Sequence, residues 1–373
     1  MDQTGQVRAG RSDHRRHVDG GRRRGLAVSR HASRVAAGLM PTLVALLVFA
    51  GGLAASLVAS EFLVRGFGRL GRKLGLAAGL VGLLTALGAD GPEISSAITA
   101  LLSGAKDVGL GVILGSNLFN LATLLGLSTV LAGRLRFRRL LLWLDGGIAL
   151  WVTVVVGLMF LAGLPPLPAV LLIVMAFAAY IFLLTAQPHR VDRFPMPDHL
   201  RHRVAAAARL IHADLDRGER PTIDRHASWA PVWWVMPSIA VIVVGSYAMV
   251  NGALVLGEQW HIPRSLLGAV GLAAITSLPN AYAATRLALL NNGTAVVSLA
   301  FNSNTLNLLA GVSIPALFIA GLRSSPGVAL DIAWLLAMTL LAVGLGWWQQ
   351  GMNRFGGLTL IVGYLLFLGF AFR

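Results

Sequence analysis

The chain has 373 residues, of which 56% are hydrophobic and only 13% are charged, and it contains no cysteine. Because soluble domains carry about 25% charged residues, most of this chain is expected to lie in lipid, and the missing thiols exclude disulfides and thiolate metal sites. The formal net charge of +15 does not indicate nucleic acid, since the arginines gather in the N-terminal tail and between apolar runs, as in proteins that contact anionic lipid headgroups.

The first segment, residues 1–39, is polar, contains nine arginines and has no apolar periodicity. This composition predicts a basic, disordered tail. It does not fit a signal peptide, because its charge is dispersed and the apolar run that follows is too long. That run begins near Met40, which leaves Met1 and Met40 as alternative starts of translation.

Ten apolar stretches follow, each long enough for a transmembrane helix of ~20 residues. They form two groups of five: 40–64, 74–102, 108–132, 139–162 and 166–186, and then 231–254, 264–290, 294–320, 327–348 and 354–372. The sequence therefore predicts an all-α integral membrane protein with two repeats, at 40–186 and 229–373. Because each repeat has an odd number of spans, the repeats must have opposite orientations in the membrane, as in inverted-repeat transporters.

A hydrophilic segment, 187–228, separates the repeats and contains eight arginines. Its apolar residues fall on one helical face, which predicts an amphipathic helix. Basic residues also gather after the first and third spans, so the positive-inside rule predicts that these connections and the loop are cytoplasmic, with connection 163–166 external. We expect the cell (inner) membrane. The same rule places both termini outside, where the basic tail is hard to translocate unless translation starts at Met40.

A polar motif with a proline occurs once in each repeat, at the same spacing. GADGPE precedes GSNLFN in the first repeat, and ITSLPN precedes FNSNTLN in the second. Pro92 lies 24 positions before Ser116, as Pro279 lies 24 positions before Ser303. A matched pair of polar motifs in two apolar halves indicates a transporter with a central ion site between its repeats.

Two carboxylates, those of Asp90 and Glu93, lie inside the second apolar stretch. An acid at the bilayer centre costs at least ~2.5 kcal/mol on insertion scales, so such residues are usually functional. Asp145 and Asp331 lie near span ends instead, where they are expected to reach water. Pro92 lacks an N–H and should free the carbonyl of Gly88, and Pro279 should break its helix in the same way. Carboxylates, freed carbonyls and hydroxyls make an all-oxygen site suited to hard cations such as Ca²⁺ or Na⁺.

Neutral oxygen ligands can complete such a site. Ser116 and Asn120 are four residues apart and share a helical face, and Ser303 and Asn307 repeat this spacing. A single serine or asparagine in a membrane helix is more simply explained by interhelical hydrogen bonding. The matched set, however, favours a cation site.

These motifs resemble the alpha-repeats of the sodium/calcium exchanger family, within the calcium:cation antiporters, each of which has GTSLPE followed by GSNIFN. The resemblance covers about 60–128 and 250–313. It implies ten helices, with the second, third, seventh and eighth enclosing the ion sites, and exchange of Ca²⁺ for Na⁺ by alternating access. It also implies that Glu93 is the acidic ligand and that the neutral ligands are Ser116, Asn120, Thr276, Ser277, Ser303 and Asn307.

The chain departs from the family pattern where charge matters most. The acidic residue of the second motif is Asn280 here, and Asp90 replaces a serine of the first motif. Ala89 replaces a threonine, Val112 a usual asparagine and Asn302 a usual glycine. We therefore predict that Asp90 supplies the charge that Asn280 lacks, and that both residues face one cavity as ligands of the cation.

Together these features predict a cation antiporter, not an enzyme, that exchanges calcium for sodium. Three alternatives remain open: proton-coupled exchange, an uncoupled cation channel, and an ion-binding relative that does not transport, which the missing charge at Asn280 allows. The expected partners are the lipid bilayer and inorganic cations (Ca²⁺, Na⁺ or H⁺), without nucleic acid or an organic cofactor. The sequence does not fix the oligomeric state.

Overall fold

The computed structural model describes residues 13–74, 78–185, 197, 233–319, 321–322 and 326–372, and describes no side chains for 13–40, 72, 78, 79 and 326. Most of the loop 187–228, including its expected amphipathic helix, lies outside the described residues.

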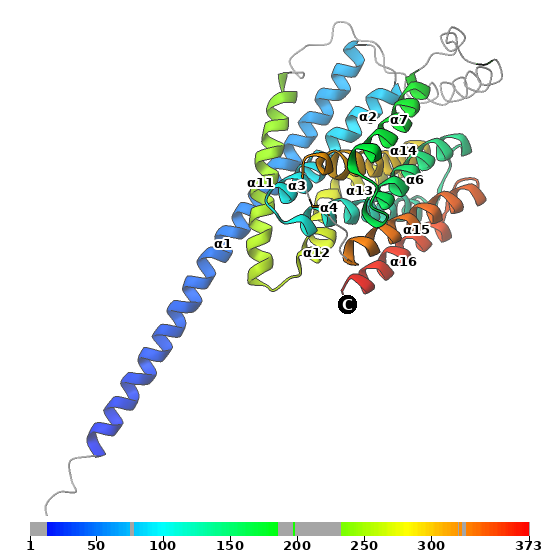
Figure 1. Ribbon diagram of the computed structural model, residues 1–373. Coiled ribbons are helices and arrows are strands. Elements are labelled where there is room, and N and C mark those ends of the chain that lie inside the picture. The colour runs from blue at the N-terminus through cyan, green and yellow to red at the C-terminus, as the bar shows by residue number, and fades with distance from the viewer. Residues whose placement is uncertain are drawn as a thin grey trace, which may run out of the picture.

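The first repeat consists of helices joined by short connections (Figure 1). In chain order these are α1 (Asp13–Leu74), α2 (Ala78–Ala89), α3 (Gly91–Leu102), α4 (Lys106–Asn120), the π-helix η1 (Leu121–Leu127), α5 (Ser128–Ala132), strand β1 (Arg134–Leu135), α6 (Arg139–Leu161) and α7 (Pro166–Thr185). The pieces α4, η1 and α5 are continuous and form one span, Lys106–Ala132.

The second repeat has the same plan. It contains α11 (Val235–Gln259), α12 (Arg264–Leu266), the π-helix η2 (Leu267–Leu272), α13 (Ala273–Leu289), α14 (Gly293–Leu306), the π-helix η3 (Asn307–Ser313), the 3₁₀-helix η4 (Pro315–Leu317), α15 (Pro326–Trp348), strand β2 (Met352–Asn353) and α16 (Arg354–Ala371). Over the described ranges, nine helices are long and apolar enough to cross a membrane. The pair α2 and α3 supplies the remaining span, so the predicted all-helical layout is confirmed.

The N-terminal segment differs from the expectation. Helix α1 begins at Asp13, so residues 13–39, predicted to be disordered, are helical. This stretch contains no proline and has seven arginines and four alanines, which are good helix formers. Because it precedes a long membrane helix directly, it can extend that helix without the cost of nucleating a new one.

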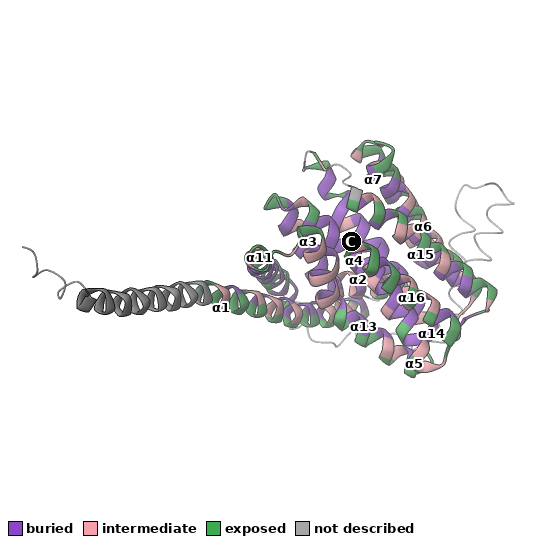
Figure 2. Ribbon diagram, turned by 90° about the horizontal axis from the view of Figure 1, so that it is seen from below, coloured by how far each residue is buried: buried purple, intermediate pink, exposed green. Residues whose placement is uncertain are grey.

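Helix α4 lies at the centre of the bundle. In its span, 89% of the most apolar window is buried inside the protein, and the inward faces of the surrounding helices are buried as well (Figure 2). Glycine permits the closest crossing, because a Cβ added to Gly115 would lie 2.1 Å from the carbonyl oxygen of Ala269 on η2. This contact brings the third span of one repeat against the seventh span of the other.

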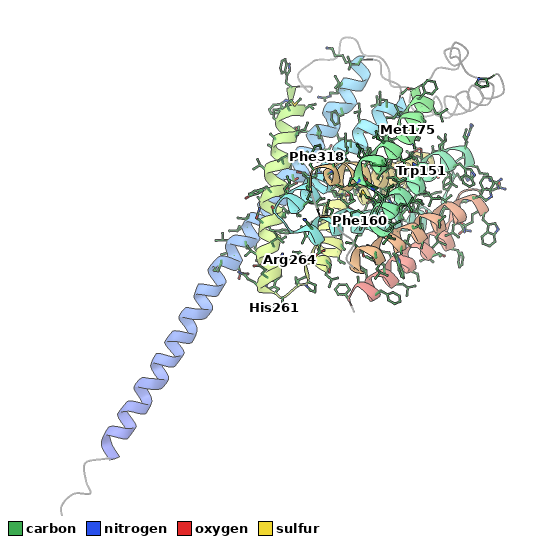
Figure 3. The ribbon with its side chains drawn as sticks, in the orientation of Figure 1. Trp151, Phe160, Met175, His261, Arg264 and Phe318 are labelled. Carbon is green, nitrogen blue, oxygen red and sulfur yellow. The ribbon has the colours of Figure 1, made fainter. Side chains whose placement is uncertain are left out.

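Helices α1 and α11 lie side by side at the periphery (Figure 1). They also cross through glycines, since a Cβ on Gly52 would lie 2.5 Å from the Gly245 carbonyl oxygen. The outer surface of the bundle is apolar, with Trp151, Met175 and Phe318 exposed by 43%, 65% and 81% (Figure 3). A surface of this kind suits contact with lipid rather than water.

The connections meet in two groups, one at each end of the bundle. At one end β1 pairs with β2, Arg134 opposite Asn353, and a Cβ on Gly293 would lie 2.5 Å from the Arg136 carbonyl oxygen. At the other end Lys106 donates to the Gly321 carbonyl over 3.3 Å. The first group joins the connections after spans three, seven and nine, and the second joins those after spans two and eight, as an inverted repeat requires.

This grouping sharpens the topology prediction. We expect Asn292, after span seven, to face the cytoplasm and Ser103, after span two, to face outward, since the first end carries the arginine-rich connection. The chain has no cysteine, so Ser103→Cys and Asn292→Cys give single labelling sites at exposed positions. An impermeant thiol reagent should label only Ser103→Cys in intact cells and both after permeabilisation. The reverse pattern would show that the orientation is inverted.

Candidate cation-binding site

The second span is interrupted at the first motif, for a local reason. Helix α2 ends at Ala89, Asp90 forms a turn, and Pro92 is the second residue of α3, where a helix does not need the missing N–H. Pro92 frees the Gly88 carbonyl, as predicted. However, the hydroxyl of Ser60 on α1 donates to this carbonyl over 2.8 Å, so the carbonyl serves the packing of α1 rather than the site.

The second motif behaves differently from the expectation. Pro279 lies inside the continuous helix α13 and does not interrupt it. The irregularity lies upstream instead, where η2 is widened to π geometry at Leu267–Leu272. The two repeats are therefore alike in sequence at their prolines but differ in backbone, so a proline motif alone did not determine where the helix would break.

Asp90 lies where the two repeats meet. Its side chain is wholly buried, and its Oδ1 accepts hydrogen bonds from Asn280 Nδ2 on α13 and from Ser303 Oγ on α14, each over 2.8 Å. The residue that adds a charge and the residue that lacks one are thus in direct contact. A carboxylate carried by either residue would therefore lie at the same place in the site, as the predicted compensation requires.

Glu93 lies one turn further along α3 and is also wholly buried. Ser277 Oγ donates to its Oε1 and Asn307 Nδ2 donates to its Oε2, each over 2.7 Å. Both carboxylates of the first repeat are therefore held by donors of the second repeat. Every one of these donors is neutral, so the negative charge of the pair is not balanced by them.

Several oxygens at the site have free lone pairs. Four buried atoms have no hydrogen-bond partner of normal geometry among the described residues: Asp90 Oδ2, Ser116 Oγ, Asn120 Oδ1 and Asn307 Oδ1. They come from the turn between α2 and α3, from α4 and from η3. An unpartnered buried polar atom is costly, and four together, all oxygens, fit the coordination of a hard cation.

Thr276 is the predicted ligand that takes least part in this network. It is buried, but its hydroxyl donates to the carbonyls of Leu272 and Ala273 in its own helix run, over 2.8 and 3.2 Å. Each of the other eight predicted residues either forms a side-chain hydrogen bond to a residue of another helix or carries one of the unpartnered oxygens. Their placement in one cluster follows from helical register and from the glycine contacts that draw α4 and η2 together.

Two asparagines at the site were not singled out by the sequence. Asn117 and Asn304 occupy matched positions of the motifs, 187 residues apart like Pro92 and Pro279, and each donates to the main-chain carbonyl of the other over 3.1 Å. The constant offset between the repeats could have identified them. The segments η1 and η3, which follow α4 and α14 directly, are π-helices, and π-helices are frequent at functional sites.

Two further buried acids correct another expectation. Asp145 and Asp331 were expected near span ends in contact with water, but they are only 1% and 8% exposed. Asp145 on α6 accepts from Tyr180 Oη of α7 over 2.7 Å and also from the Ser298 hydroxyl of α14. Tyr180 lies 2.9 Å from the Asn302 Oδ1. This cluster ties α6 and α7 to the helix that carries Ser303.

The fold and site define a multi-pass membrane protein with two homologous repeats around a buried, acidic, oxygen-lined centre. Comparison with known families agrees. The pattern of the family described as sodium/calcium exchanger protein matches residues 44–187 and 230–373. The chain belongs to this family, within the calcium:cation antiporters, and is therefore a transporter of the cation antiporter class rather than an enzyme.

Individual relatives are distant. CaxA, a candidate antiporter of Alkalimonas amylolytica, is 23% identical over 330 residues, which cover 87% of this chain and 97% of CaxA. The sodium/potassium/calcium exchanger 4 of Mus musculus is 31% identical over 145 residues, 35% of this chain but only 22% of that exchanger.

Solved structures share the fold. The sodium-calcium exchanger NCX_Mj superposes with a TM-score of 0.58 at 17% identity, covering 88% of this chain and 99% of that one. The H⁺/Ca²⁺ exchanger CAX superposes with a TM-score of 0.64 at 15% identity, covering 91% and 88%. At these identities the likeness establishes the architecture, and the choice of ions must be argued from the residues of this chain.

Proposed function

We propose that the protein exchanges Ca²⁺ for Na⁺ across the cell membrane, by alternating access to one site between Asp90 and Glu93. The observation that carries this proposal is the pair of buried carboxylates, each bonded only by neutral donors among the described residues and surrounded by unpartnered oxygens. A divalent cation neutralises two carboxylates and accepts neutral oxygens as further ligands.

The same charge balance explains why transport is exchange and not leak. Two negative charges without a cation, in the low-dielectric interior of a membrane protein, are strongly unfavourable. The site therefore reorients only when its charge is neutralised, by one Ca²⁺ or by two monovalent cations. It follows that one Ca²⁺ exchanges for two monovalent ions and that no net charge crosses the membrane in a cycle.

Sodium is the counter-ion that we propose, because the site offers hydroxyl and amide oxygens. Na⁺ is a hard cation that these oxygens coordinate, whereas a proton would need only the two carboxylates. Proton coupling would leave Ser116, Asn120 and Asn307 without a role in the returning half of the cycle.

Isotope flux in proteoliposomes tests the proposal. Calcium uptake should require an opposing Na⁺ gradient and should not respond to a pH gradient. It should also keep the same rate when a potassium diffusion potential is imposed, since the exchange is electroneutral. Uptake driven only by a pH gradient would establish the proton-coupled alternative, and uptake without any counter-ion would establish a channel.

A further inference from the structure

Four asparagines lie together where α4 meets α14 and the start of η3, at positions that the repeats share. Asn117 and Asn304 form one matched pair, Asn120 and Asn307 the other, and all are at most 3% exposed. The pair Asn117 and Asn304 is bonded reciprocally, each side-chain Nδ2 donating to the main-chain oxygen of the other over 3.1 Å.

These reciprocal bonds fix which end of each amide points where. A main-chain carbonyl oxygen can only accept, so the amide nitrogen must face it. The oxygens of Asn117 and Asn304 therefore face the opposite way, toward the other pair. Asn117 Oδ1 accepts from Asn307 Nδ2 over 3.1 Å, and Asn304 Oδ1 lies 3.4 Å from Asn120 Nδ2.

These contacts also fix the orientation of the side-chain amides of Asn307 and Asn120, the residues proposed as ligands. Asn307 Nδ2 uses its second hydrogen on Glu93 Oε2 over 2.7 Å, and Asn120 Nδ2 uses its second on Ser303 Oγ over 3.1 Å. Both nitrogens are fully engaged, and the Oδ1 atoms of Asn120 and Asn307 are left without partners. A flipped Asn307 amide would place its oxygen against two acceptors.

We propose that Asn117 and Asn304 are positioning residues that turn the amides of Asn307 and Asn120 so that each presents oxygen, not nitrogen, to the cation. This inference rests on the proposed function of the same site. The arrangement is crossed, because Asn117 of the first repeat orients a ligand of the second, and Asn304 of the second orients a ligand of the first. Neither repeat can orient its own amide ligand alone.

The test compares Asn117→Leu in two backgrounds. Leucine has the same branching at Cγ as asparagine, with two methyl groups in place of the amide oxygen and nitrogen, and therefore has neither its donor nor its acceptor, so Asn307 is no longer held. In the parent background, the Ca²⁺ dissociation constant of the purified protein, measured by calorimetry, should rise by about tenfold or more. Asn304→Leu should act in the same sense through Asn120.

The second background is Asn307→Asp. A carboxylate carries oxygen at both ends, so its orientation no longer matters. Asn117→Leu then removes only an acceptor that faces another oxygen, and it should not raise the Ca²⁺ dissociation constant by more than about threefold. Ser128→Ala serves as a control, since it removes a buried hydroxyl on α5, beyond η1 and away from the site. It should leave the dissociation constant unchanged in both backgrounds.

Three outcomes overturn the inference. The first is that Asn117→Leu lowers thermal stability while the folded protein binds Ca²⁺ as the parent does, which is the signature of packing alone. The second is an equal loss of affinity in both backgrounds. The third is a parent protein that binds no Ca²⁺, which overturns the proposed function as well. A parent that binds Ca²⁺ without exchanging it overturns only the proposed function, and the comparison of dissociation constants still decides the inference.

Discussion

Replacing Glu93 with glutamine is expected to abolish cation exchange while leaving the protein folded and inserted in the membrane. Glutamine keeps the size of the side chain and one oxygen, which can still accept from Ser277. It removes one of the two charges at the site. It also places an amide nitrogen near Asn307 Nδ2, which in the parent protein donates to the Glu93 carboxylate over 2.7 Å. Removing one partner of a buried ionic contact typically costs about 3–5 kcal/mol.

A loss of that size lowers Ca²⁺ affinity by roughly 100-fold or more, so flux at ordinary calcium concentrations should be undetectable. Calcium flux into proteoliposomes measures it, with thermal unfolding of the purified protein as the check on folding. Glu61→Gln is the matched control, because this acid of α1 pairs with Arg65 at the surface, the two side chains being 59% and 60% exposed. The control should transport like the parent, and normal flux by Glu93→Gln would remove the basis of the proposed site.

Moving the second charge from one repeat to the other is expected to preserve part of the activity. Asn280 Nδ2 donates to Asp90 Oδ1 over 2.8 Å, so a carboxylate on either residue lies beside the same point in the cavity. Asp90→Asn alone should lose divalent transport, because the remaining charge cannot balance Ca²⁺. Asp90→Ser combined with Asn280→Glu keeps two charges at the site and should recover at least part of the flux.

The informative quantity is the coupling between the two positions, so Asp90→Ser, Asn280→Glu and the double variant are compared with the parent in one cycle. Compensation predicts that the double variant transports better than the two single effects combined would allow. Additive effects would show that the positions act independently. Parent-like transport by Asp90→Asn would assign Asp90 a structural role.

The local part of this site could be predicted from sequence because helical register is a local property. Ser116 and Asn120 share a face whatever surrounds them, and the equal spacing of the second motif placed Ser303 and Asn307 on the corresponding face. The carboxylates were evident because an acid within an apolar run demands an explanation. The positions of Asp90 and Asn280 beside matched prolines predicted that both face one cavity, but not that they hydrogen-bond to each other directly.

The rest depends on contacts between helices far apart in the chain. Asn117 is adjacent to Ser116 and so points elsewhere on α4, and its role arises only where α14 crosses. Asp145 was expected to reach water, and no neighbouring residue reveals that Tyr180 and Ser298 enclose it. Pro279 is a case in which a local rule was misleading. The rule for proline predicted a break in the helix, but α13 is continuous through Pro279.

The central claim, that one cation binds between Asp90 and Glu93 with oxygens from both repeats, is tested most directly by locating the ion. Crystals of the protein with Sr²⁺, a divalent cation with a strong anomalous signal, should show one peak roughly 2.5 Å from carboxylate oxygens of both acids, with the Oδ1 atoms of Asn120 and Asn307 facing it. An ion bound only elsewhere, at Asp145 or at exposed acids, with no density between Asp90 and Glu93, would contradict the account.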